Sequence, residues 1–258
     1  MTRRLIVNAD DFGDTPAVNA AVIKAYREGV LRFASLMVLR PAAAEAAALA
    51  KANPGLGVGL HLELCADAPE KAGLRYFFDR AARAGLEGEI RAQIEALLAL
   101  GVKPTHVDGH INVHVHPVIF PALCRLAKEY AIPRVRLPSG EWPAYRALRG
   151  PRLSKAVLAG TFAALGLSVR GAASGLEVPN TWGLLNSGLM SEDYVLGLLE
   201  RLPEGTSELY FHPTTNPALV AGALPTTSHQ AVGELEVLLS PRVREALAAN
   251  GVELISAR

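Results

Sequence analysis

Residues 4–28 have the sequence RLIVNADDFGDTPAVNAAVIKAYRE, and this stretch indicates the fold class. The short apolar run at its start, residues 4–9, predicts a buried strand. Thr15 and Pro16 then supply an N-cap and a first-turn proline, which predict a helix that continues to about Glu28. A buried strand followed directly by a helix is the repeating unit of α/β folds with a parallel sheet.

The same alternation continues along the chain. Further strand candidates lie at 33–39, 57–64, 134–138, 208–213 and 252–257, a strand is expected to begin within 105–117, and helical patterns cover 41–52, 87–100 and 117–130. For 258 residues this pattern favours a single-domain distorted (β/α) barrel over 1–258, with about seven mainly parallel strands ringed by helices. An open doubly wound sheet is the alternative. Residues 139–188 have the least regular pattern and are expected to form a long excursion from this domain.

The composition limits the classes of function. The 26 basic and 25 acidic residues give a formal charge of +1 without a basic block, which argues against a nucleic-acid partner. The N-terminal apolar run is too short for a signal peptide, and no stretch is expected to reach the roughly 18 to 20 apolar residues of a membrane span. Cys65 and Cys124 are expected to be buried thiols. These features predict a cytoplasmic globular protein, whose oligomeric state stays open.

One stretch is rich in metal-ligand side chains. Residues 105–117, THVDGHINVHVHP, contain four of the seven histidines, and their polar side chains alternate with apolar ones. In a strand this alternation would place all the imidazoles on one face. Imidazole is the commonest metal-binding side chain and the usual acid or base near neutral pH. The stretch therefore predicts part of a functional site.

Acids and imidazoles also stand where predicted strands end. These residues are Asp10 and Asp11, His61, Asp108 and His110, and His212. Because the carboxyl ends of parallel strands meet at one rim, we expect these side chains to converge. Asp11, His61 and His110 would form a metal site with open positions for water or substrate. Asp10 would then act as a general base, or alternatively as a second ligand or a helix cap.

Other interpretations of these motifs are weaker. His106 and Asp108 have the spacing of an iron facial triad, but such enzymes commonly have all-β folds, which the strand–helix alternation contradicts. His114 and His116 resemble the paired histidines of amidohydrolase barrels, which would be expected in the first strand. The Asp-Phe-Gly at 11–13 lacks the upstream motifs of a protein kinase.

The excursion at 139–188 contains several aromatic side chains. Trp142, Tyr145 and Trp182 offer flat apolar faces that could stack on sugar rings, although ordinary packing is slightly favoured for each of them. His229, in a polar segment, is expected to be a surface residue at the start of a helix.

Four ordered motifs together resemble the YdjC-like carbohydrate deacetylases, which include chitooligosaccharide deacetylases. They are LIVNADDFG (5–13), GLHLEL (59–64), PTHVDGHINVHVHP (104–117) and ELYFHP (208–213). The resemblance extends from Leu5 to about His212, and the segment 183–213 is most similar to the branch associated with hopanoid biosynthesis. It implies a distorted (β/α) barrel.

The resemblance also implies roles for five residues. Asp11, His61 and His110 would be the metal ligands, Asp10 the general base and His212 the acid that protonates the leaving amine. The implied cofactor is a divalent metal ion, with Mg²⁺ favoured and Zn²⁺, Mn²⁺ or Co²⁺ possible.

This chain departs from the family pattern directly after the third ligand. Where the family often has three consecutive histidines, it has His110, Ile111 and Asn112. The ligand itself is retained, so the departure concerns the contacts with the sugar, and the sequence leaves the preferred sugar open.

The activity that the resemblance implies is hydrolysis of the N-acetyl group of an acetylated amino sugar or oligosaccharide, with release of acetate. Two alternatives stay open: a metal-dependent hydrolase of another acyl substrate, and a non-catalytic sugar-binding protein on the same scaffold. The presence of both Asp10 and His212 argues against the second, because a binding protein needs no matched base and acid.

Overall fold

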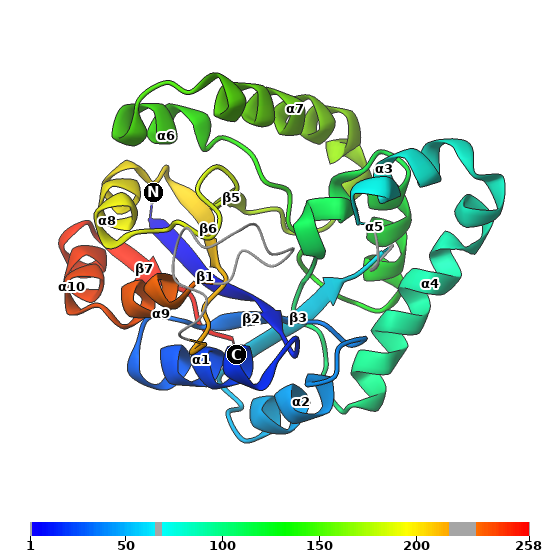
Figure 1. Ribbon diagram of the computed structural model, residues 1–258, viewed down its shortest axis with the longest axis horizontal. Coiled ribbons are helices and arrows are strands. Elements are labelled where there is room, and N and C mark those ends of the chain that lie inside the picture. Colours follow the sequence, from blue (N-terminus) through cyan, green and yellow to red (C-terminus); the bar gives the residue numbers. More distant parts are fainter. Residues whose placement is uncertain (1, 65–68, 217–230, 258) are drawn as a thin grey trace.

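The computed structural model describes residues 2–64, 69–216 and 231–257, and its centre is a curled parallel sheet (Figure 1). The strands are β1 (Arg3–Phe12), β2 (Phe33–Leu36), β3 (Gly57–Leu62), β4 (Val107–Gly109), β5 (Asn180–Trp182), β6 (Gly205–Phe211) and β7 (Val252–Leu254). Their order is β4-β3-β2-β1-β6-β5, with β7 also paired to β1.

β1 occupies the middle of the sheet because its side chains from Leu5 onward are buried on both faces, as in the central strands of parallel sheets. Along one edge it pairs with β6 from Arg3 to Ala9. Along the other edge it pairs first with β7, through residues 3–5, and then with β2, from Asn8 onward.

Residues 134–138 extend the sheet between β4 and β5. They form single parallel bridges, Val107 with Val135, Arg134 with Glu177, and Pro138 with Thr181. The strand predicted here is therefore in the right place, but it has no continuous ladder; Pro133 and Pro138 contribute no N–H donor. The result is a curled half-barrel of parallel strands in one α/β domain, which confirms the distorted barrel and excludes the open doubly wound sheet.

Helices surround the sheet, as Figure 1 shows. They are α1 (Pro16–Glu28), α2 (Ala43–Lys51), α3 (Pro69–Phe78), α4 (Arg80–Ala99), α5 (Ile119–Glu129), α6 (Trp142–Arg149), α7 (Leu153–Val169), α8 (Glu192–Arg201), α9 (Val232–Leu239) and α10 (Pro241–Ala249), with 3-10 helices η1 (His110–Val115) and η2 (Arg170–Ala173). Thr15 caps α1 as predicted, because its hydroxyl accepts the N–H of Val18. Helix α4 begins seven residues before the predicted 87–100, at a cap formed by Asp79, whose carboxylate accepts the N–H of Ala82.

The strand predicted for the histidine stretch is wrong beyond Gly109. There β4 ends, and Ile111 and Asn112 take left-handed conformations with φ of 49° and 58°. These two residues turn the chain, so the side chains of residues 110–116 do not alternate across one sheet.

The excursion at 139–188 is more regular than its sequence indicates, because it contains α6, α7, η2 and β5. Residues Leu153–Ala173 also form one helical stretch long and apolar enough to cross a membrane, by length and composition alone. This is an exception to the expectation that no stretch reaches that length.

Several predicted side-chain environments can be compared with the structure. Tyr145, Trp182 and Cys124 are buried in the hydrophobic core, which agrees with packing roles for the two aromatic residues. Burial raises the pKa of the Cys124 thiol to about 11, as expected for an inert buried cysteine. Cys65 and His229 lie outside the described residues.

Candidate metal centre and active site

The first two site residues follow one another at the end of β1, and a local irregularity directs both toward the same place. The pairing of β1 with β2 shifts register between Ala9 and Phe12, and Asp11 has a φ of 61°. In a regular strand Asp10 and Asp11 would point to opposite faces. The bulge and the left-handed conformation bring both carboxylates to the carboxyl-end rim of the sheet.

Two neighbouring strands supply a paired imidazole and carboxylate. His61 of β3 lies in register with Asp108 of β4. Asp108 accepts a hydrogen bond of 2.7 Å from Nδ1 of His61, which leaves Nε2 directed toward Asp11 Oδ1 at 3.4 Å. A carboxylate on the far nitrogen of an imidazole fixes its tautomer and orientation, as it does for many metal-bound histidines.

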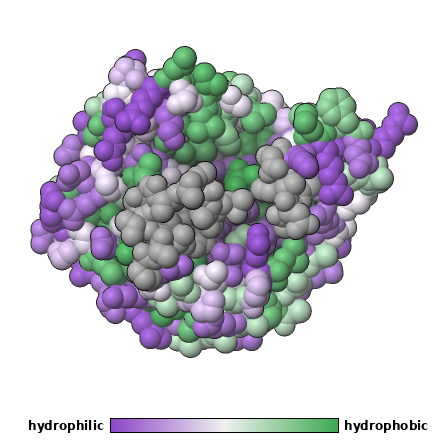
Figure 2. All heavy atoms as spheres, viewed as in Figure 1, coloured by the Kyte–Doolittle hydropathy of each residue, from purple (hydrophilic) through white to green (hydrophobic). Residues whose placement is uncertain are grey.

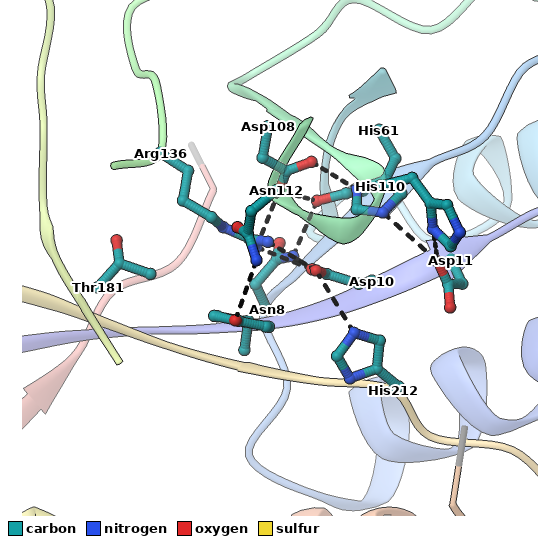
Figure 3. Close-up of polar contacts among 12 residues, drawn as sticks. Asn8, Asp10, Asp11, His61, Asp108, His110, Asn112, Arg136, Thr181 and His212 are labelled. Atoms are coloured by element: carbon teal, nitrogen blue, oxygen red, sulfur yellow. Dashed lines mark hydrogen bonds and ion pairs between the residues drawn. The ribbon is translucent and has the colours of Figure 1, made fainter. Parts of the chain in front are cut away.

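His110 completes a three-residue cluster with Asp11 and His61. It directly follows β4, and its Nδ1 lies 3.1 Å from Asp11 Oδ1 (Figure 3). One nitrogen or oxygen from each of these residues lies within 4.8 Å of the others. The structure thus brings together the three ligands predicted from sequence.

This cluster has the chemistry of a cation site. Within the described part of the chain, Oδ2 of Asp11 is buried and has no hydrogen-bond donor. Three buried carboxylates, those of Asp10, Asp108 and Glu208, surround the guanidinium of Arg136, and the fourth, that of Asp11, lies against His61 and His110. Because these acids outnumber Arg136, a divalent cation on Asp11 would reduce a charge imbalance that burial makes costly.

The same imbalance perturbs the titration of the cluster. Burial alone would raise the pKa of Asp11, but hydrogen bonds from His110 and His61 hold it well below its usual value. Burial alone would lower the pKa of His61, but the charge and hydrogen bond of Asp108 raise it well above its usual value. Asp11 is therefore available as an anionic ligand at neutral pH.

Arg136, which no sequence motif predicted, connects three acidic side chains of the site. It forms a two-bond ion pair with Asp10, Nη1 to Oδ2 at 2.6 Å and Nη2 to Oδ1 at 2.8 Å. Its Nη2 also lies 2.8 Å from Asp108 Oδ2 and 2.7 Å from Glu208 Oε1. This bidentate contact holds the Asp10 carboxylate in one orientation. The only sign of this role in the sequence was the position of Arg136 at the middle of the predicted strand 134–138.

His212 lies immediately after β6, across the site from the cluster. Its Nε2 is 3.8 Å from Asp10 Oδ2, as Figure 3 shows. Glu234 of α9 accepts the backbone N–H of His212 at 2.6 Å, and its Oε2 lies 3.8 Å from Nδ1. Burial alone would lower the pKa of His212, but Glu234, Asp10 and Asp11 raise it. His212 therefore keeps its proton to a higher pH than an ordinary histidine, as a general acid near neutral pH requires. Glu234 was not identified from sequence.

These side chains border a pocket of about 270 Å³. Its lining includes Asp10, Asp11, His110, Asn112, Tyr210 and His212 from the sheet side, and Lys155, Leu158 and Phe162 from α7. A second cavity, of about 270 Å³ and mostly apolar, shares Phe162 and Leu184 with it and is lined by Trp142. Of the three aromatic residues considered for sugar stacking, Trp142 lines this cavity, and Tyr145 lines a further cavity that also includes Glu234.

The other histidines of residues 105–117 have structural partners. His106 bonds Ser35 and Thr105 through its two nitrogens. His114 contacts the carbonyl of Arg136, and burial lowers its pKa to about 4. His116 contacts the carbonyl of Gly73. The facial triad and the paired-histidine site considered from sequence are therefore not assembled.

Comparisons with known proteins agree with this architecture. A carbohydrate deacetylase of Geobacillus stearothermophilus is 34% identical over 272 residues, which cover 100% of this chain and 98% of that protein. A carbohydrate deacetylase of Brevibacillus brevis is 41% identical over 148 residues, or 52% of this chain and 59% of that protein. The crystal structure of a protein described as a cellobiose-phosphate cleavage protein, from Enterococcus faecalis, superposes with a TM-score of 0.72 at 23% identity, covering 99% of this chain and 97% of the other; it shows the fold alone.

The family comparison covers almost the whole chain. The model of the YdjC-like protein family matches residues 4–249, a range that includes every residue of the cluster described above. The match and the full-length relative agree with the resemblance seen in the four sequence motifs. This chain therefore belongs to the YdjC-like protein family.

Proposed function

We propose that this protein is a metal-dependent carbohydrate N-deacetylase, which hydrolyses the acetamide of an acetylated amino sugar to acetate and a free amine. The observation that carries the proposal is the convergence of the Asp11, His61 and His110 cluster with Asp10 and His212 on one pocket. Relatives named carbohydrate deacetylase support the substrate class.

The cluster of Asp11, His61 and His110 would hold the divalent ion. When bound, such an ion polarises an amide carbonyl and makes water a nucleophile near neutral pH. Mg²⁺ is favoured by the family resemblance, whereas two imidazoles among three ligands suit Zn²⁺ or Co²⁺ better than an ion that prefers oxygen. We propose the site for a divalent ion and leave its identity to metal analysis.

The protein's own groups would move the protons. Asp10, held by Arg136 with Oδ2 facing His212, takes the proton from the attacking water. His212 donates a proton to the amide nitrogen as the carbon–nitrogen bond breaks, because an amide departs only as a neutral amine. The amine, the acetate ion and one released proton together contain all the atoms of the amide and the water.

The pocket walls would position the sugar. Tyr210 and Asn112 carry the polar groups beside the reacting centre, and their side chains lie 3.4 Å apart. Asn112 stands where relatives often have a histidine, so we propose that it contributes to the choice of sugar. The likeness to the hopanoid-associated branch and the cytoplasmic location stay predictions.

The test is acetate release from N-acetylated chito-oligosaccharides by metal-stripped protein titrated with single divalent ions. We expect release that depends on the ion and that Asp10→Asn lowers by at least about 100-fold, within the contribution of a general base. Asp14→Asn, the same change in the loop after β1, should keep full activity.

Two results would contradict the proposal. Stoichiometric metal binding without acetate release from any N-acetylated sugar, but with release from O-acetylated ones, would identify an esterase. Failure to bind a divalent ion would remove the role of Asp11, His61 and His110.

A further inference from the structure

Helix α7 is apolar around most of its circumference although it lies at the surface, and its exposed polar side chains are those of Ser154, Thr161 and Ser168. No charged residue occurs between Lys155 and Arg170. Within α7 only Gly166 and Val169 are buried. A helix that is apolar all round normally lies in a protein core or in lipid, and α7 is not in a core.

The two sides of α7 differ in what they contact. The inner side packs against α6, η1 and η2, and through Leu158 and Phe162 it lines the pocket of the site. The outer side is formed by Leu153, Val157, Gly160, Ala164 and Leu167, which recur at alternating spacings of four and three residues and are all exposed. Leu153 and Leu167 are 82% and 81% exposed. Such a continuous apolar face marks an interaction surface.

The segment that forms this face carries charges of one sign only. From Trp142 to Leu176 the chain has no Asp or Glu, but it has five basic residues: Arg146, Arg149, Arg152, Lys155 and Arg170. Neither α6, η1 nor η2, which pack against α7, contributes an acidic residue. Figure 2 shows hydrophobic atoms gathered over the upper edge, where α7 lies in Figure 1, with hydrophilic atoms beside them.

We propose that the outer face of α7 docks this protein on the surface of a bilayer that contains anionic lipid. The exposed leucines and valine would enter the boundary between headgroups and acyl chains, while the basic residues at both ends of α7 would meet the anionic headgroups. The helix lies in the plane of the surface and does not span the bilayer, because its inner side packs on the protein. Basic residues at both ends of α7 favour anionic lipid over a second copy of this chain, which would bring the same positive charges together.

Docking in this way has a consequence for the site. Leu158 and Phe162 border the pocket from the inner side of α7, so the pocket would lie next to the lipid headgroups. The proposal does not depend on the reaction, since binding to lipid needs neither the metal nor the proton-transfer groups.

The test is co-sedimentation of the full-length protein with vesicles of phosphatidylcholine, with and without phosphatidylglycerol. We expect binding to the anionic vesicles that weakens as salt is raised. The combined change Leu153→Glu, Val157→Glu and Leu167→Glu should lower the partition coefficient by at least about 100-fold, because three apolar side chains no longer enter the lipid. Arg152→Glu with Arg170→Glu should weaken binding to anionic vesicles only.

Controls separate docking from folding and from self-association. Leu98→Glu changes an exposed leucine on α4 and should leave vesicle binding intact. The triple variant should keep its thermal unfolding temperature and its activity on soluble oligosaccharides. Wild-type protein that stays in the supernatant with anionic vesicles would overturn the proposal. A dimer that the triple variant dissociates, without any vesicle binding, would overturn it as well and assign α7 to a contact between two copies.

Discussion

At the scale of single residues, the titration of His212 is set by the acids that face it. Asp10, Asp11 and Glu234 raise its pKa against the effect of burial. If His212 is the acid, activity is present while it is protonated and is lost as the pH rises through its pKa. The alkaline limit of the pH–rate profile should therefore report this residue.

Glu234→Gln removes one of these charges and should lower the pKa of His212. We expect the alkaline limb of kcat to move to lower pH by about one unit, measured by acetate release across the pH range. Glu236→Gln, on the exposed side of the same helix, is the matched control and should leave the limb in place. An unchanged limb in Glu234→Gln would show that another group donates the proton.

Asp108 acts on the metal site through His61. Asp108→Asn weakens the 2.7 Å contact that orients the His61 ring, so we expect divalent-ion affinity to fall by about 10- to 100-fold. Competition with a chromogenic chelator measures this directly. The same affinity in wild type and variant would mean that the backbone of β3 alone positions His61.

The sequence was sufficient to identify residues at strand ends, but not the residues that hold them. Asp11, His61 and His110 could be found because parallel strands direct their carboxyl ends to one rim. Arg136 and Glu234 could not, because each contacts the site from another segment of the chain, and each has a second charged residue two positions away, Arg134 or Glu236, from which no pattern separates it. Asp10 and Asp11 also face the same site because of a bulge in β1, and no pattern of residues in the sequence predicts that bulge.

At the scale of elements, β3 passes close to the residue that precedes β4, where a glycine meets a histidine. A Cβ on Gly59 would lie 2.5 Å from Nε2 of His106, a ring held by Ser35 and Thr105. We expect Gly59→Ala to lower the free energy of unfolding by about 1 to 3 kcal/mol, the usual cost of overpacking. Urea unfolding measures the change.

A glycine on α4 provides the contrast. A Cβ on Gly85 has no neighbour within 4 Å, so Gly85→Ala should raise the free energy of unfolding by about 0.5 to 1 kcal/mol through helix propensity alone. Equal effects of the two changes would contradict the close approach at Gly59.

Elements with strong local signals were predicted well, and those set by tertiary contacts were not. Helix α1 follows from Thr15 and Pro16, and β3 from its apolar run. β4 is short because Ile111 and Asn112 turn left-handed, a conformation that alternating polarity does not reveal. Within 139–188, the Gly, Pro and Ser residues made the sequence pattern irregular, so the two α-helices and the strand there were not predicted.

At the scale of the whole molecule, Arg136 holds residues 134–138, which extend the sheet between β4 and β5, against three strands. It is fully buried and pairs with Asp10 of β1, Asp108 of β4 and Glu208 of β6. Burial alone would lower its pKa, and these carboxylates raise it well above the ordinary value. Arg136→Met leaves the carboxylates without their counter-charge and should cost about 3 to 5 kcal/mol of unfolding free energy.

The control for this change is Arg125→Met, which removes an exposed arginine paired with Glu87 and should cost less than about 1 kcal/mol. If both variants unfold at the same denaturant concentration, the buried ion-pair network does not stabilise the closure of the sheet.

The central place of β1 determines when the molecule can fold as it is made. β1 leaves the ribosome before its three neighbours, and two of these, β6 and β7, begin only at residues 205 and 252. Pairings so distant in sequence carry a large loop-closure cost and form late. A nascent chain therefore exposes one unpaired edge of β1 until residues 205 onward have been made. Chaperones that bind apolar segments would meet that edge first, and the finished sheet can form only after β7 has been made.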